Sequence, residues 1–185
     1  MKKIKKICAI TGSRAEYGLL SNLLKGLNSN DYVELQLIVT GTHLSNYHGL
    51  TYKEIENDNL FISGKVDLKI IKNNSNGLAK QMSRGFIGFS KLFVKLKPDL
   101  ILILGDRYEI LSAAIVATLF NIPIAHIHGG EITQGSIANA FRPSITKMAH
   151  LHFVATRLSE QRVLQLGEQK KYIFHVGSLG VENIK

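Results

Sequence analysis

The segments LILILGDRYEI (residues 100–110) and IPIAHIHGGEITQGSIANAFRPSIT (residues 122–146) decide the fold of this chain. Each begins with an unbroken apolar run, Leu100–Leu104 and Ile122–Ile127, which ends abruptly in polar and charged residues. Continuous runs of β-branched residues and leucines are typical of strands buried on both faces, which belong to parallel sheets covered by helices. Ligands of such sheets bind beyond the carboxyl ends of the strands, so we expect the polar residues after both runs to lie at a binding site.

Strand and helix signals alternate along the rest of the sequence as well. Short apolar or alternating runs predict seven strands: Ile7–Thr11, Tyr32–Thr40, Gly64–Ile71, Asp99–Gly105, Ile124–His128, Leu151–Ala155 and Tyr172–Val176. Six helices are predicted between them: one around Leu19–Leu27, then Thr51–Asn59, Leu78–Leu96, Tyr108–Phe120, Ile137–Ala149 and Leu158–Gly167. Because crossovers between parallel strands are right-handed, this order predicts an α/β fold with a doubly wound, mostly parallel, Rossmann-like sheet.

Pro143 is an anomaly in the predicted helix 137–149. A proline inside a helix removes one hydrogen bond and clashes with the preceding turn. We therefore expect a kink there, or a helix that starts near Arg142.

Length and composition indicate an ordinary globular domain. A chain of 185 residues, 45% hydrophobic and 20% charged, is long enough for one α/β domain with a full core. Its longest apolar stretch is interrupted by polar residues and a proline, and its lysine-rich start lacks the apolar core of a signal peptide. We therefore expect no membrane segment and a cytoplasmic location. Cys8 is the only cysteine, which excludes an internal disulfide, and its place in a strand predicts a core position.

The formal net charge of +9 is compatible with either a nucleic acid or an anionic metabolite as partner. The lysines are scattered, and the sequence contains no nucleic-acid-binding motif with interleaved aromatic residues. Since base recognition needs side chains gathered on one element, we expect no nucleic-acid partner.

Three residues after the first two strands could contact an anion. Ser13 and Arg14 open the first helix, whose free N–H groups and positive dipole end favour a phosphate or carboxylate. A capped helix with a surface arginine is the alternative, because the stretch lacks both the dinucleotide-binding glycine pattern and the Walker lysine. His43 follows the second strand and could either face the ligand or form a local hydrogen bond.

Ionisable residues also gather at the ends of the two central apolar runs: Asp106, Arg107, Glu109, His126, His128 and Glu131. Burial at the end of a strand raises the pKa of a carboxyl group and suits it to proton transfer, whereas a neighbouring cation opposes that rise. Helix capping by Asp106 and buried hydrogen bonding by the histidines are the alternatives. Because alternate residues of a strand point to opposite faces, His126 and His128 cannot easily reach one ion, and we expect no metal site.

Five motifs, in this order along the chain, carry a resemblance to a known family. They are VTGTHLS (39–45), GDRYE (105–109), HIHGGE (126–131), SITK (144–147) with HLHF (150–153), and VGSLGVENI (176–184). Together they resemble the hydrolysing UDP-N-acetylglucosamine 2-epimerases of sialic and legionaminic acid biosynthesis. The resemblance implies the N-terminal half of a glycosyltransferase-B-like fold: a Rossmann-like domain at residues 1–177 and the start of an interdomain hinge at residues 178–185, with the second domain absent.

The resemblance also implies a reaction. A UDP-linked 2-acetamido sugar would be eliminated to UDP and a 2-acetamidoglucal, and then hydrated to the free manno-configured sugar, with no cofactor. Asp106 and Glu131 would be the catalytic acid/base residues, since loss of a proton and a diphosphate needs both a base and an acid. The substrate-binding residues would be Arg14, His43, Arg107 and His128. A homo-oligomer, dimer or tetramer, is expected.

Two positions depart from the family pattern: Ala138 stands where an aspartate is usual, and Pro143 where a histidine is usual. Alanine cannot transfer a proton, and the resemblance implies that the second domain supplies most uridine contacts and further catalytic groups. We therefore expect this chain to be weak or inactive alone. A non-catalytic nucleotide-sugar or anion-binding module on the same fold is therefore an alternative. A glycosyltransferase half-domain is another, and an NAD-dependent enzyme is disfavoured because the glycine fingerprint is missing.

Overall fold

The computed structural model describes residues 4–70, 74–133 and 137–182. Its seven strands form one sheet in the order β3-β2-β1-β4-β5-β6-β7, and every pair is parallel. They are β1 (Lys5–Thr11), β2 (Val33–Thr40), β3 (Ile62–Val66), β4 (Leu100–Leu104), β5 (Ile124–Ile127), β6 (Leu151–Val154) and β7 (Ile173–His175). The predicted doubly wound parallel sheet is confirmed.

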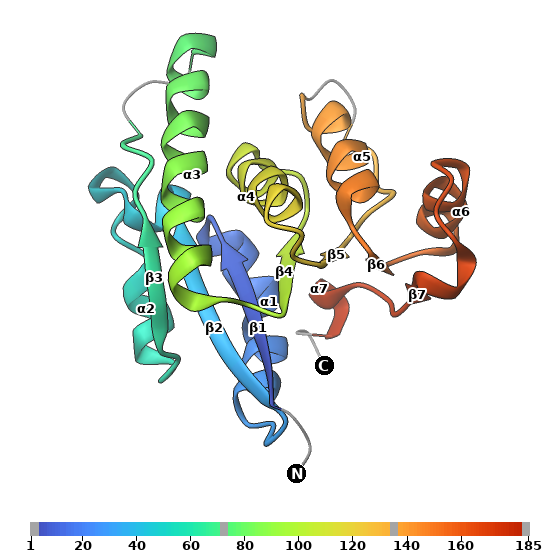
Figure 1. The fold of residues 1–185 in the computed structure, drawn as a ribbon, viewed down its shortest axis with the longest axis horizontal. Helices are drawn as coiled ribbons and strands as arrows, with labels where there is room; N and C mark the ends of the chain where they lie inside the picture. Colours follow the sequence, from blue (N-terminus) through green and yellow to red (C-terminus); the bar gives the residue numbers. More distant parts are fainter. Residues whose placement is uncertain (1–3, 71–73, 134–136, 183–185) are drawn as a thin grey trace.

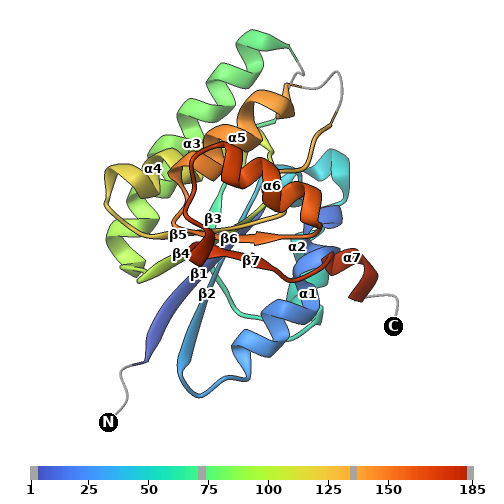
Figure 2. The ribbon, with the colours of Figure 1, turned by 90° about the vertical axis from the view of Figure 1, so that its right-hand side faces the viewer.

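Helices cover both faces of this sheet (Figure 1). One face carries α3 (Ser75–Leu96), α4 (Tyr108–Leu119), α5 (Ala138–Met148) and α6 (Arg157–Gln165). The other carries α1 (Arg14–Asn28), α2 (Tyr52–Asn57) and the short α7 (Leu179–Glu182), and Figure 2 shows the sheet between the two layers. Within the described residues, three 3-10 turns lie in the connections: η1 (Gly41–Leu44), η2 (Asn46–His48) and η3 (Lys170–Tyr172). No helix in the described part of the chain is long and apolar enough to cross a membrane.

The central strand β4 explains why an unbroken apolar run is needed here. Ile101 and Ile103 pack into the core beneath α3 and α4, whereas Leu102 and Leu104 pack into the core beneath α1. Both cores exclude water, so neither set of alternate positions can be polar. Cys8 lies fully buried in the first of these cores, as predicted.

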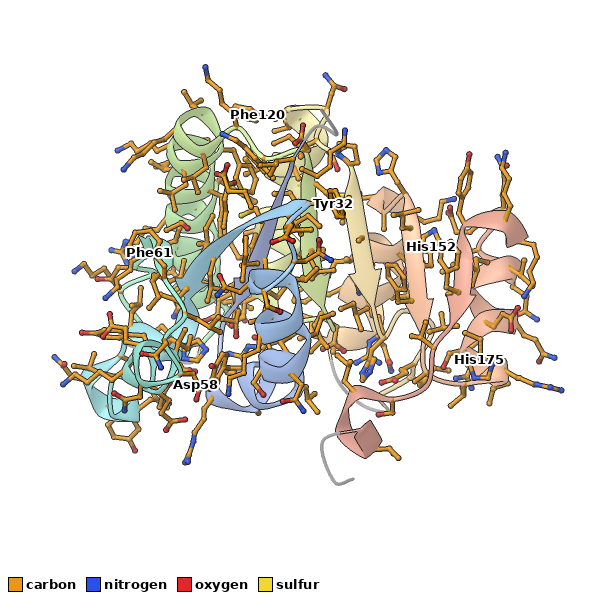
Figure 3. All side chains as sticks on the ribbon, turned by 90° about the horizontal axis from the view of Figure 1, so that it is seen from below. Tyr32, Asp58, Phe61, Phe120, His152 and His175 are labelled. Carbon is orange, nitrogen blue, oxygen red and sulfur yellow. The ribbon has the colours of Figure 1, made fainter. Side chains whose placement is uncertain are left out.

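The α1 face of the sheet is covered only in part. Figure 3 looks onto this face, where α1 and α2 lie over one half of the sheet. Beside α1, an apolar groove of about 420 Å³ runs along β4, β5 and β6 and reaches Leu179 of α7. Single exposed apolar residues are normal on proteins, but a continuous groove of this kind leaves sheet surface open to solvent.

Most predicted boundaries differ from the structure by one to three residues, and two differences have a local cause. Strand β3 ends at Val66, because the carboxylate of Asp67 accepts a hydrogen bond from the backbone N–H of Lys69 and turns the chain; Ile71, the predicted end, lies outside the described residues. Of the two alternatives for Pro143, a helix start near Arg142 is wrong, since α5 begins at Ala138 and continues through Pro143, whereas a kink stays a prediction. Pro143 is the sixth residue of α5, so the helix loses one hydrogen bond but keeps its first turn.

Candidate functional site

The strand order predicts a crevice between the carboxyl ends of β1 and β4. From these neighbouring strands the chain winds in opposite directions, so the loops at their carboxyl ends diverge and leave room for a ligand. Gly12 and Ser13 follow β1 at this edge, and Asp106 and Arg107 follow β4. The loop after β2 closes one side, because the N–H of Thr42 donates to the carbonyl of Gly12 over 2.8 Å.

Asp106 and Glu131 meet through one arginine, Arg142, which no pattern in the sequence singles out. The Arg142 guanidinium donates to Asp106 Oδ2 from Nη2 (2.5 Å) and Nε (3.1 Å), and to Glu131 Oε2 from Nη1 (3.1 Å). The Arg142 side chain is only 9% exposed, so little water competes for these contacts. His128 joins the group, with Nδ1 at 3.5 Å from Glu131 Oε1. The structure thus brings together Asp106, His128 and Glu131, around a cation that comes from α5.

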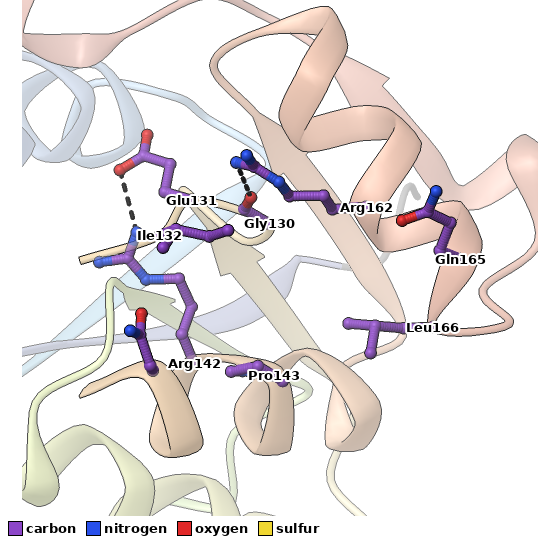
Figure 4. Close-up of a pocket in the computed structure, with 9 residues that line it drawn as sticks. Gly130, Glu131, Ile132, Arg142, Pro143, Arg162, Gln165 and Leu166 are labelled. Carbon is purple, nitrogen blue, oxygen red and sulfur yellow. Dashed lines mark hydrogen bonds and ion pairs between the residues drawn. The ribbon is translucent and has the colours of Figure 1, made fainter. Parts of the chain in front are cut away.

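A pocket opens beside this ion-pair cluster (Figure 4). It has a volume of about 350 Å³ and is lined by Glu131, Arg142 and Pro143, and by Arg162 from α6. Arg162 donates to the carbonyl of Gly130 over 3.2 Å, which ties α6 to the glycine turn. The pocket therefore offers two guanidinium groups and a carboxylate, a combination that suits a polar, anionic ligand.

Arg107 turns to the other side of β4, where it meets two buried glutamates. Its Nε donates to Glu109 Oε1 over 2.5 Å, and Glu16 Oε2 accepts the N–H of Gly12 over 2.7 Å. Burial, then the Glu109 charge, raise the pKa of Glu16 to about 8. Burial also raises the pKa of Glu109, although Arg107 opposes that rise. The glycines make this packing possible: a Cβ on Gly12 would lie 2.3 Å from Glu109 Oε1.

His43 and His126 are held inside the protein by both ring nitrogens. His43 contacts the hydroxyls of Thr11 (3.1 Å) and Thr51 (2.8 Å). His126 contacts the carbonyl of Gly105 (2.8 Å) and the hydroxyl of Thr146 (3.2 Å). Burial lowers the pKa of each imidazole to about 4, so both are neutral at pH 7 and link neighbouring strand ends. A direct ligand contact by His43 stays a prediction.

Arg14 lies at the surface rather than in the crevice. Its Nε is 3.0 Å from Glu54 Oε1, and the Arg14 side chain is 74% exposed. Ser13 caps α1, because its hydroxyl accepts the N–H of Glu16 over 3.3 Å. These contacts match the capped-helix alternative, and a phosphate contact by Arg14 stays a prediction. Within the described ranges, no group of three histidine, cysteine, aspartate or glutamate residues is placed to hold a metal ion.

The protonated state of Glu16 predicts a pH dependence of stability. The unfolded chain loses this proton near pH 4.5 and the folded chain near pH 8, so the free energy of unfolding should fall as pH rises between these values. Below this window both states hold the proton, and above it neither does. Urea unfolding from pH 5 to 8 gives the slope of the free energy of unfolding against pH. Glu16→Gln should remove the contribution of Glu16 to this slope. The exposed Glu34→Gln should retain the wild-type slope, and an unchanged slope in Glu16→Gln would contradict the assignment.

A doubly wound parallel sheet that gathers carboxylate and guanidinium groups at its carboxyl edge defines a Rossmann-like α/β domain with a charged ligand site. Comparison with known proteins extends this to a family. The chain belongs to the UDP-N-acetylglucosamine 2-epimerase family, whose family model matches residues 25–185. The resemblance carried by the sequence motifs is thereby confirmed.

Individual relatives agree with this assignment. The chain is 46% identical over 181 residues to the GDP/UDP-N,N'-diacetylbacillosamine 2-epimerase (hydrolyzing) of Campylobacter jejuni, covering 98% of this chain and 47% of that protein. It is 40% identical to the UDP-N,N'-diacetylbacillosamine 2-epimerase (hydrolyzing) of Legionella pneumophila, covering 98% of this chain and 48% of that protein. The chain therefore spans about half the length of these curated relatives.

A solved structure shares the fold. The crystal structure of UDP-GlcNAc 2-epimerase from Neisseria meningitidis, bound to UDP-GlcNAc, superposes with a TM-score of 0.83 at 18% identity. The match covers 97% of this chain and 48% of that chain. At this identity the likeness establishes the fold alone.

Proposed function

We propose that this chain is the N-terminal domain, residues 1–177, of a hydrolysing 2-epimerase that acts on a UDP-linked 2-acetamido sugar. Residues 178–185 would begin the hinge to a second domain, which is in keeping with the half-length coverage of the relatives. The observation that carries the proposal is the convergence of Asp106 and Glu131 on Arg142, with Arg107 next to Asp106 in the sequence.

The proposed reaction needs the groups that this edge of the sheet supplies. A base removes the proton from C2 of the sugar while the bond from C1 to the diphosphate oxygen breaks, and UDP leaves with the bonding electrons. Water then adds its hydroxyl to C1 and a proton to C2 from the opposite face, which gives the manno configuration. Asp106 and Glu131 are the acid/base candidates, and Arg107 stabilises the charge that develops on the leaving diphosphate.

Arg142 orients both acid/base candidates, because one planar guanidinium holds an oxygen of each carboxylate. His128 lies against Glu131 and would contact the sugar from the same side. The pocket of Figure 4 borders this cluster, and Arg162 adds a second cation to its lining.

UDP release from UDP-N-acetylglucosamine, or from its 2,4-diacetamido analogue, tests the proposal. We expect weak release by the wild-type chain and a rise of at least roughly tenfold in Ala138→Asp, because a positioned acid–base group contributes about 10²–10⁴-fold. Ala138 opens α5 one turn before Arg142, so a carboxylate there starts close to the cluster. Ala140→Asp, a matched control elsewhere on the first turn, should give no rise.

A non-catalytic nucleotide-sugar-binding module is the second candidate, favoured by the alanine at position 138. That candidate predicts binding of UDP-N-acetylglucosamine without UDP release in either the wild-type chain or Ala138→Asp. The absence of both binding and release would contradict both functions.

The proposal includes a cytoplasmic homo-oligomer. Cys8 is a buried free thiol, which fits a reducing compartment. The helix α3 carries two exposed apolar residues, Ile87 and Val94, that an oligomer interface could use, whereas its Phe89 and Phe93 are buried in the core.

A further inference from the structure

Glu16 and Glu109 bury two carboxyl groups beside a single guanidinium, at the crevice between β1 and β4. One oxygen of Glu109 binds Arg107 Nε, and one oxygen of Glu16 binds the Gly12 N–H. The remaining oxygens, Glu16 Oε1 and Glu109 Oε2, are buried and have no hydrogen-bond partner among the residues that the structure describes. Two buried carboxylates against one cation would leave an uncompensated negative charge, which is costly away from water.

A single proton on this pair removes the surplus charge. Glu109 is held as a carboxylate by Arg107, so the proton belongs on Glu16, whose pKa burial and the Glu109 charge raise. The other ionisable groups that face the cluster keep their charge state near neutral pH. Burial lowers the pKa of His43, on η1, to about 4, and it raises the pKa of Tyr108, on α4, to about 12.

Arg107 is anchored from one side only. Its Nε contacts Glu109, whereas its two terminal nitrogens have no hydrogen-bond partner in the described part of the chain. Its side chain is 35% exposed, although Glu109 is fully buried. The guanidinium is therefore fixed at its inner end and offers its outer N–H groups to an anion at the crevice.

We propose that Glu16 is a positioning residue that, while it carries a proton, allows Arg107 to bind the diphosphate of the substrate, and that this affinity falls when Glu16 ionises. The inference rests on the proposed function, in which Arg107 contacts the diphosphate. Ionised Glu16 adds a negative charge inside a region of low dielectric, where charges act over several ångströms. It weakens the field of Arg107 and competes for its N–H groups.

Calorimetric titration of UDP into the 185-residue chain at pH 7, 8 and 9 tests this inference. The terminal phosphate of UDP is ionised throughout this range, since phosphate monoesters lose their second proton near pH 6. The wild-type affinity should fall roughly tenfold or more between pH 7 and pH 9. Glu16→Gln, which keeps the size of the side chain and stays neutral, should retain its pH 7 affinity at pH 9. Glu34→Gln, an exposed glutamate at the start of β2, should show the wild-type fall.

Binding of UDP with the same pH dependence in wild type and Glu16→Gln would overturn the inference and leave the proposed function standing. No binding of UDP at any pH would overturn both. A second measurement needs no variant: carbon-13 NMR of the Glu16 carboxyl, followed against pH with and without UDP. Because linkage is reciprocal, UDP should move the titration midpoint of Glu16 to higher pH, and an unmoved midpoint would overturn the inference.

Discussion

Alanine in place of Gly130 should lower the free energy of unfolding by about 3–5 kcal/mol, because two independent costs add at this position. Gly130 has a φ of +77°, a conformation that side chains other than glycine rarely adopt. An added Cβ would also lie 2.2 Å from the carbonyl oxygen of Ser159, in the first turn of α6. That oxygen is backbone, so the turn must move as a unit.

Urea unfolding of Gly130→Ala checks this expectation, with Gly26→Ala as the matched control. Gly26 lies on the exposed side of α1, and a Cβ there would meet no atom within 4 Å. The control should gain about 0.5–1 kcal/mol from helix propensity. Equal stabilities in the two variants would show that α6 does not press against the Gly130 turn.

Removing the Arg142 guanidinium is the other change with a large expected effect. Arg142→Ala leaves the carboxylates of Asp106 and Glu131 side by side without their shared cation. Breaking a buried ion pair costs about 3–5 kcal/mol, and we expect about 3 kcal/mol here, since the Glu131 side chain is 35% exposed and partly solvated. For a domain of this size the melting temperature should drop by roughly 6–12 °C.

Calorimetry of three variants separates this loss from a general effect of removing arginine. Arg142→Lys should fall between wild type and alanine, because an ammonium cannot hold two carboxylates in the planar fork geometry. Arg14→Ala breaks an exposed ion pair with Glu54 and should cost less than about 1 kcal/mol. If Arg142→Ala were as stable as Arg14→Ala, the cluster would contribute nothing to the fold.

The sheet was predictable because its central strands are buried on both faces. The runs at residues 100–104 and 122–127 contain one polar residue, His126, so little in them confuses strand with loop, and the observed strands β4 and β5 fall within them. The edge strand β3 was harder to predict. The first three positions of β3 are only half-buried, so its burial shows no clear alternation, and the carboxylate of Asp67, a local contact without periodicity, marks its end.

The candidate site was predictable only where residues follow strands. Asp106 and Glu131 could be selected because parallel strands end at a common edge. Arg142 could not, since its partners are 36 and 11 residues away and nothing in a helical pattern marks a long-range ion pair. The full burial of His43 could not be predicted either, because a histidine that follows a strand can face the ligand site or be buried beneath it.

The position of β1 has a consequence for synthesis on the ribosome. Ile7 pairs with Leu35 on one side and with Leu100 on the other. One edge of β1 therefore stays unpaired until the ribosome has synthesised β4. At about 5–20 residues per second, this interval lasts for seconds, during which an aliphatic strand edge is open to foreign strands. A holding chaperone that covers nascent β1 and β2 should therefore raise the yield of folded protein more than one that acts after release.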